Sequence, residues 1–207
     1  MNFKCYYHRS SDNHLNDEKF KNDYNEITSV IKSITDNDLI EGFYEDKANR
    51  SSAVSLSTAI NKILKERLVD LNWKPEAALF KNEDYLTDPE SNRKYKSWRL
   101  DFAKNLISIE VGFNHGEAIA HNMMKPVFAS EMNHLEKDIK TELGIIITAT
   151  HSFKKVGGFD GAVGTYEKHI KYFSAYHNYM PTPIVLIGLL PPKSFRVDKK
   201  IKDVVLL

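Results

Sequence analysis

Two short, nearly continuous apolar runs most constrain how this chain can fold. Residues 143–148 read Leu-Gly-Ile-Ile-Ile-Thr, and residues 183–190 read Pro-Ile-Val-Leu-Ile-Gly-Leu-Leu. Runs of this length and composition are typical of central strands whose two faces are both covered by other elements. Neither run approaches the ~18 apolar residues that a membrane-spanning helix needs. The sequence therefore predicts a buried sheet with helices on both of its faces.

The segments around these runs alternate between helix and strand patterns. Residues 17–34 carry apolar side chains at spacings of three, four and seven, which is the period of an amphipathic helix: Phe20, Ile27, Val30, Ile31 and Ile34. Residues 57–72 and 166–179 show the same period, whereas residues 106–113 alternate as a strand does. We therefore expect an α/β fold with a central mixed sheet flanked by helices.

Length and composition favour a single folded domain without a membrane segment. The chain has 207 residues, 42% of them hydrophobic, so it can bury a core of its own. We expect an N-terminal helical part over 1–50, a core over 51–190 and a tail over 191–207. Cys5 is the only cysteine, which excludes an internal disulfide and fits a reducing compartment. Because residues 1–10 lack an apolar signal core, we expect a cytoplasmic protein.

The net charge gives no argument for or against a nucleic-acid partner. Lys and Arg number 29 against 28 Asp and Glu, so the formal charge is +1. Any case for such a partner must therefore come from local placement of charge.

A pair of acidic residues lies in what looks like a hairpin. Residues 98–102 form a short alternating run, and residues 103–105 make a plausible turn into the strand 106–113. If the two strands pair, Asp101 and Glu110 lie on the same face within reach of one divalent cation. Two carboxylates with waters and a substrate phosphate are the usual environment of Mg²⁺. The alternative is that both are solvated edge residues.

Two basic segments are candidates for contact with a nucleic-acid backbone. One precedes Asp101 and interleaves basic residues with aromatic ones: Arg93, Lys94, Tyr95, Lys96, Trp98 and Arg99. The other is a glycine-rich loop over 151–161 that carries polar side chains: Ser152, Lys154, Lys155 and Asp160. A solvated loop explains the first equally well, and a simple strand-to-helix connection explains the second.

These residues together resemble a known enzyme family. Asp101 followed nine positions later by Glu110 resembles the active-site hairpin of the type II restriction endonucleases of the BglII/BstYI family, within the PD-(D/E)XK nuclease superfamily. The helix over 57–73, which ends Leu-Asn-Trp-Lys, is similar to a helix of that family, as are segments 144–148, 151–167 and 183–188 in the same order. The resemblance covers most of the chain from about Ser51 to Leu190.

The resemblance implies a homodimer that cuts a short palindromic duplex DNA site by Mg²⁺-dependent hydrolysis within a restriction–modification system. The resemblance suggests a GATC-centred site, but residues 154–158 do not themselves specify bases, so the recognition sequence stays open. Asp101 and Glu110 would hold the metal together with the backbone carbonyl of Val111. Candidate DNA contacts are Arg93, Lys94, Lys96, Arg99, Asn114, His115, Ser152, Lys154, Lys155 and Asp160.

One position departs from the family pattern. The third catalytic position, which holds Gln, Glu or Lys in relatives, is Gly112 here. Asn114 or His115 would supply the missing catalytic group if the strand bulges at the glycine, or the metal and the substrate phosphate would generate hydroxide without a side-chain base. Two rival functions remain: a sequence-specific DNA-binding dimer with weakened or lost catalysis, and an unrelated α/β protein whose carboxylates lie on its surface.

Overall fold

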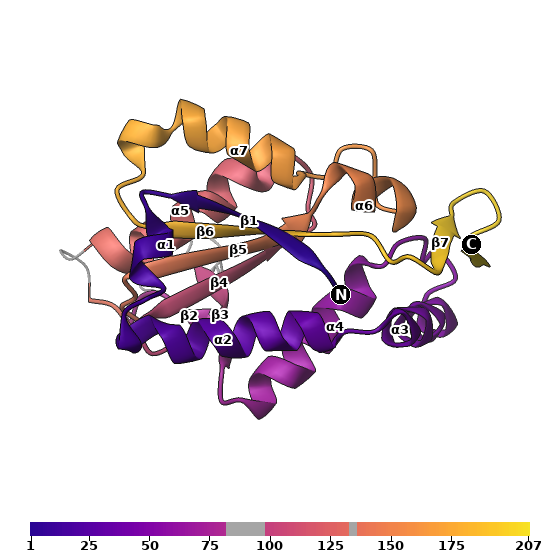
Figure 1. Ribbon diagram of the computed structural model, residues 1–207, viewed down its shortest axis with the longest axis horizontal. Coiled ribbons are helices and arrows are strands. Elements are labelled where there is room, and N and C mark those ends of the chain that lie inside the picture. The colour runs from indigo at the N-terminus through magenta and orange to yellow at the C-terminus, as the bar shows by residue number, and fades with distance from the viewer. Residues whose placement is uncertain (82–97, 133–135) are drawn as a thin grey trace, which may run out of the picture.

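A central mixed sheet organises the molecule. The computed structural model describes residues 1–81, 98–132 and 136–207, and within these ranges the main sheet has six strands in the order β1-β6-β5-β4-β3-β2. Its strands are β1 (Phe3–His8), β2 (Lys74–Ala78), β3 (Arg99–Lys104), β4 (Ile107–Gly112), β5 (Leu143–Ala149) and β6 (Ile184–Leu189). Helices lie on both faces of this sheet (Figure 1). The predicted fold class is therefore confirmed.

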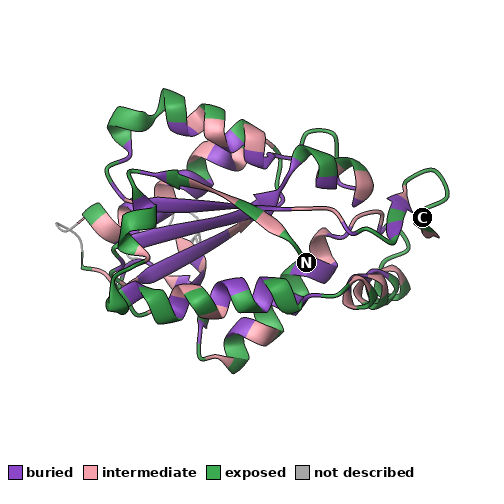
Figure 2. Ribbon diagram, viewed as in Figure 1, coloured by how far each residue is buried: buried purple, intermediate pink, exposed green. Residues whose placement is uncertain are grey.

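The two apolar runs form the middle of the sheet, as predicted. β4, β5 and β6 are parallel, with Ile109 opposite Ile145 and Ile145 opposite Val185. All residues of β5 and β6 are buried, and these strands stand out as continuously buried in Figure 2. β1 pairs antiparallel with β6, and β2, β3 and β4 form an antiparallel meander at the other edge.

Two helical layers cover the sheet. One face packs against α2 (Glu18–Ser33) and α4 (Ser57–Asp70), and the other against α5 (Ala118–Glu131) and α7 (Tyr166–Ala175) (Figure 1). Helices α2, α4 and α7 match the predicted segments; Asp17 caps α2, and a short 3-10 helix (His177–Tyr179) follows α7. The smaller elements are α1 (Ser11–His14), α3 (Asp36–Asn49), α6 (His151–Val156) and the antiparallel pair β7 (Phe195–Asp198) and β8 (Asp203–Leu206).

Several local expectations are corrected. The expected helical part over 1–50 begins with a strand, because Phe3–His8 adds to the edge of the sheet beside β6. The tail over 191–207 contains the β7–β8 hairpin. The expected loop over 151–161 begins with helix α6. Thr150 caps the N-terminus of α6, because its side chain accepts a hydrogen bond from the backbone N–H of Phe153. Helix α5 was not expected at all.

The predicted hairpin exists, but its turn is shifted. Ala103 and Lys104 belong to β3, since they pair with Ser108 and Ile107, and the chain reverses at Asn105 and Leu106. Asn105 adopts a positive φ of 49°, which asparagine tolerates better than most residues.

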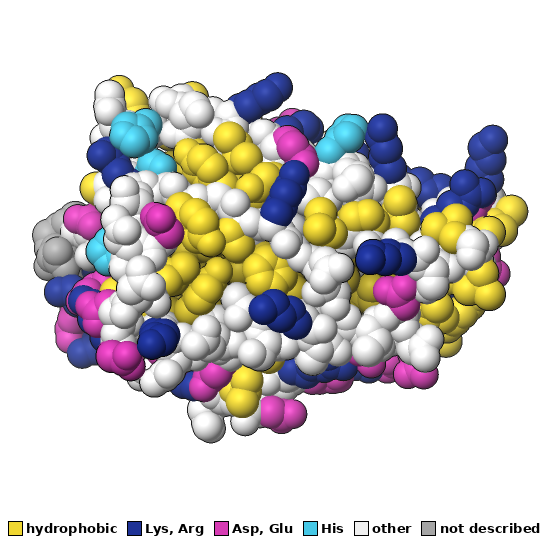
Figure 3. Space-filling view, in the orientation of Figure 1, with side chains coloured by type: hydrophobic (Ala, Val, Ile, Leu, Met, Phe, Trp, Pro, Cys, Tyr) yellow, Lys and Arg dark blue, Asp and Glu magenta, His cyan; other side chains and the backbone are white. Residues whose placement is uncertain are grey.

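The surface mixes both signs of charge. On the face shown in Figure 3, basic and acidic side chains are interspersed around an apolar area, without a continuous basic field. Among the residues that the structure describes, no helix is long and apolar enough to cross a membrane.

Candidate active site at the open end of the β3–β4 hairpin

The hairpin brings the two predicted carboxylates together. The antiparallel register of β3 and β4 runs from Lys104–Ile107 to Phe102–Ile109, and Asp101 and Glu110 are the next residues of the two strands toward the open end of the hairpin. The Oδ2 atom of Asp101 accepts a hydrogen bond of 2.6 Å from the backbone N–H of Val111. The side chain of Glu110 is only 1% exposed. Thus the strand neighbour of Glu110 fixes the orientation of Asp101.

Burial makes both carboxylates unusually hard to ionise. It raises the pKa of Glu110 to about 8, and the nearby charge of Asp101 acts in the same direction. Burial also raises the pKa of Asp101, while the Val111 amide and the charge of Lys125 oppose that rise. Two desolvated carboxylates side by side favour a cation between them, and such perturbed pairs gather at functional sites.

A lysine that the sequence reasoning missed contacts this pair. Lys125 of α5 places its Nζ 2.7 Å from Oε2 of Glu110, whereas the buried Oε1 of Glu110 has no hydrogen-bond partner among the described residues. A signal for Lys125 was present, because it is the only Asp, Glu, Lys or Arg between Ala118 and Ser130. A lone charge within an apolar stretch indicates a paired or functional group.

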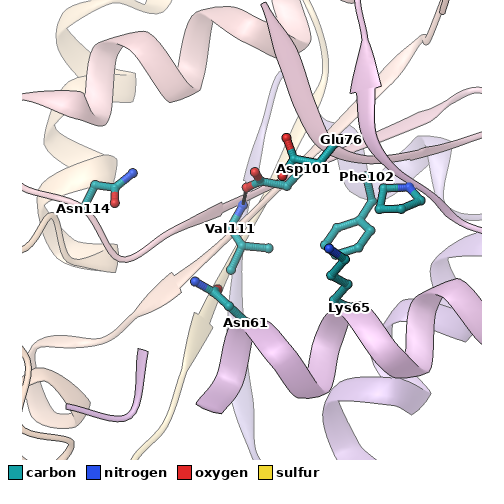
Figure 4. A pocket seen from close by; sticks show the side chains of 8 residues that line it. Asn61, Lys65, Glu76, Asp101, Phe102, Val111 and Asn114 are labelled. Carbon is teal, nitrogen blue, oxygen red and sulfur yellow. Dashed lines mark hydrogen bonds between the residues drawn. The ribbon is translucent and has the colours of Figure 1, made fainter. Parts of the chain in front are cut away.

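A cleft opens next to Asp101. It has a volume of about 240 Å³, and its polar lining comes from α4, β2, β3 and the end of β4: Asn61, Lys65, Glu76, Asp101 and Asn114. Figure 4 shows Asp101 beside Val111 and Glu76, with Asn61 and Lys65 reaching in from the helix and Asn114 standing apart. The sequence reasoning did not single out Asn61, Lys65 or Glu76.

A second groove of about 490 Å³ adjoins the cleft. Asn114, His115 and Asp160 all line it, and Asn114 also lines the first cleft. Asp160 accepts a hydrogen bond of 2.7 Å from the backbone N–H of Ala162, which lowers the pKa of Asp160. His115 lines only this second groove, and among the described residues it forms no hydrogen bond or ion pair with Asp101 or Glu110.

The other predicted DNA contacts are spread more widely. Arg99 of β3 donates from Nη1 to the backbone oxygen of Glu76 at 3.1 Å. Ser152, Lys154 and Lys155 lie on α6, where Ser152 and Lys155 are exposed and Lys154 donates to the backbone oxygen of Gly161. They do not line either hollow. Arg93, Lys94 and Lys96 lie outside the described residues.

Gly112 is not the site of a bulge. β4 keeps a continuous register with β5 from Ile107 to Gly112, which lies opposite Thr148. The bulge that would have recruited Asn114 or His115 to the third catalytic position is therefore wrong, because the parallel ladder with β5 fixes the strand there. A Cβ atom at position 112 would lie 3.2 Å from Nδ2 of Asn122 on α5. That helix covers the glycine closely.

Comparisons with known proteins agree with this architecture. A family model described as restriction endonuclease BglII/BglIII matches residues 3–189. Among solved structures, the chain resembles restriction endonuclease BglII complexed with a DNA 16-mer, with a TM-score of 0.66, 18% identity and coverage of 99% of this chain and 87% of that chain. Free BglII gives a TM-score of 0.59, 18% identity and coverage of 92% and 80%. A search of curated proteins found no match. From the family match over nearly its whole length, the chain belongs to the BglII/BglIII restriction endonuclease family.

Proposed function

We propose that this restriction endonuclease is a Mg²⁺-dependent type II enzyme of the PD-(D/E)XK superfamily. It acts as a homodimer of single-domain chains on a short palindromic DNA site, centred on GATC, within a cytoplasmic restriction–modification system. The observation that carries the proposal is the pair of the half-buried Asp101 and the buried Glu110 beside a polar cleft.

The donor atoms at the hairpin fit Mg²⁺. No group of three or more His, Cys, Asp or Glu side chains that could hold a metal occurs in the described parts of the chain, so the proposed site rests on two carboxylates and the backbone carbonyl of Val111. Mg²⁺ is suited to such a set because it prefers hard oxygen donors and keeps part of its water shell. The buried Oε1 of Glu110 accepts no hydrogen bond from any residue that the structure describes, and a cation would satisfy it. A bound Mg²⁺ would lower the pKa of water and neutralise charge on the scissile phosphate.

The chain's own residues would position the DNA around this pair. The Val111 amide holds Asp101 in place. Lys65 and Asn61 of α4 line the cleft and would contact the backbone next to the scissile phosphate. Asn114, His115 and Asp160 line the adjoining groove and would approach base edges, where donor and acceptor patterns specify sequence.

The remaining predicted contacts would bind the phosphate backbone. Arg99, Ser152, Lys154 and Lys155 belong to this class, together with Arg93, Lys94 and Lys96. A palindrome presents the same half-site twice, so a two-fold dimer matches it.

Digestion of unmethylated phage DNA tests the proposal. We expect discrete fragments with Mg²⁺, none with Asp101→Ala, and wild-type cutting with Glu66→Ala, because Glu66 is an exposed acid on α4 that pairs with Lys62. Sequencing of the fragment ends would give the recognition site and the cleavage position together. Uncut DNA at high enzyme excess across several divalent ions would contradict the proposal.

A second candidate function follows from Gly112. Because a glycine cannot orient water or contact phosphate, the dimer would bind a DNA sequence without cutting it. A specific gel shift in Ca²⁺ together with no product in Mg²⁺ would favour this second function.

A further inference from the structure

Position 112 of β4, two residues after Glu110, is a glycine and therefore carries no functional side chain. Helix α5 packs over this position. Asn122 of α5 is buried, and its Nδ2 lies 3.2 Å from where a Cβ of residue 112 would stand. A long polar side chain at position 112 would therefore meet the helix. The glycine at position 112 therefore leaves room for the close approach of α5.

A second glycine, Gly144, allows α5 to approach the next strand even more closely. A Cβ atom at Gly144 of β5 would lie only 2.6 Å from Cβ of Pro126, so any larger residue there would displace the helix. Asn122 and Pro126 are four positions apart and lie on the same side of the helix, facing the sheet. Lys125 lies between Asn122 and Pro126 in the sequence. The contacts of these two residues with the sheet therefore fix the backbone position from which the Lys125 side chain extends.

From that place the lysine reaches the carboxylate pair. Its ammonium lies 2.7 Å from Oε2 of Glu110, with the side chains 12% and 1% exposed. Its charge also acts on Asp101. Burying a charged group this deeply costs free energy of folding unless the group is paired. Proteins keep such buried charged groups where a function requires them. A lysine ammonium has three donors, and among the described residues only Glu110 accepts from this one.

We infer that Lys125 of α5 is the third catalytic residue of this endonuclease and takes the place that Gly112 leaves empty on the strand. The inference rests on the proposed DNA-cleaving function. The attacking water forms a new O–P bond and gives one proton to solvent. The P–O bond to the leaving deoxyribose oxygen breaks, and that oxygen takes one proton from solvent. The Lys125 side chain donates a hydrogen bond to a non-bridging phosphate oxygen as negative charge builds there.

Single-turnover cleavage of unmethylated phage DNA tests this role. Lys125→Met keeps the aliphatic stem and removes the charge, and it should slow cleavage by about 100-fold or more, which is typical when a charge-stabilising donor is lost. DNA affinity in Ca²⁺ should stay within about threefold of wild type. Lys104→Met is the matched control, because Lys104 is a half-buried lysine on β3 that pairs with Glu26 at the other end of the strand. Its cleavage rate should stay close to wild type.

Chemical restoration separates catalysis from structural support. The chain has one cysteine, so Lys125→Cys in a Cys5→Ser background can be aminoethylated at a single position, which regenerates a lysine analogue. We expect at least a tenfold recovery of the cleavage rate with an unchanged circular dichroism spectrum. The aminoethylation experiment also tests the catalytic role of Lys125 if the Lys125→Met variant does not fold.

Two results would overturn the inference: Lys125→Met cutting within about threefold of wild type, or no recovery after aminoethylation of folded protein. Failure of the proposed function looks different, because then the wild-type protein itself leaves the DNA uncut.

Discussion

Glu110 is the residue whose environment says most about the site. It is buried, one of its oxygens has no hydrogen-bond partner in the part of the chain that the structure describes, and burial raises its pKa to about 8. A raised folded-state pKa means that the group's contribution to stability is fully present below pH 4.5 and is lost as the pH rises toward 8. The metal-free protein therefore becomes less stable across this window.

Mg²⁺ should reverse that loss. Since the cation binds the ionised carboxylates, we expect the rise in melting temperature caused by Mg²⁺ to grow from pH 6 to pH 8.5. The effect of Glu110 alone amounts to at most about 1.4 kcal/mol per pH unit. Thermal unfolding with EDTA or with Mg²⁺ measures it, and Glu110→Gln should show little dependence of this kind. A Mg²⁺ effect of the same size at all pH values would contradict the assignment.

Asn114, which lines both hollows, and Lys155, which lies on α6 outside them, should affect DNA binding in different ways. Asn114→Ala removes a group that we expect to read a base edge, so it should weaken specific binding by about 1–3 kcal/mol and leave non-specific binding unchanged. Lys155→Ala removes an exposed charge on α6, so it should weaken binding to all sequences alike and reduce the salt slope by about one. Anisotropy titrations in Ca²⁺ at several salt concentrations measure both effects. Equal losses on specific and random DNA for Asn114→Ala would exclude base readout.

The positions of the proposed site residues differed in how far they could be predicted from the sequence. The proximity of Asp101 and Glu110 could be predicted, because the two residues lie on adjacent strands of one hairpin, at similar distances from its turn. Lys125 was not, because its partner lies on another element, and only the packing of α5 on two glycines brings it there. The link between Asn114 and both hollows likewise depends on tertiary structure.

At the scale of elements, continuous apolar runs and clear helical periods predicted well. β5, β6, α2 and α4 all fall where the pattern placed them. Helix α5 was missed because it contains His121, Asn122 and Pro126, and a proline inside a segment argues against a helix. β1 was missed because a short edge strand with one side partly open shows neither a continuous nor a regular pattern.

The packing of α5 predicts a sharp difference between two glycines. Gly144→Ala places a methyl group 2.6 Å from Pro126, so it should destabilise the protein by about 1–3 kcal/mol and slow cleavage by shifting Lys125. Gly161→Ala is the control for stability, because nothing lies within 4 Å of its added Cβ. Urea unfolding of both variants tests this. If Gly144→Ala is as stable as wild type, α5 does not depend on that contact.

For the whole molecule, the near-neutral charge of +1 limits what long-range attraction can contribute. Binding would then depend on the grooves and on two-fold matching of the DNA rather than on a broad basic field. We expect a particle of twice the 23.8 kDa chain mass by sedimentation, and two chains per duplex in the Ca²⁺ complex. One chain per duplex at saturating protein would contradict the proposed dimer.

The pairing of β1 with β6 has a consequence for how the enzyme folds during its synthesis. Phe3 lies opposite Leu189, so β1 can complete the sheet only after β6 has been synthesised. Contacts between such distant segments slow folding, since a long loop must close before they form. The hairpin residues Asp101 and Glu110 are synthesised before β5 and β6, which pack beside β4 in the folded sheet. A nascent chain should therefore remain unable to cut its host's DNA until its last strands emerge from the ribosome.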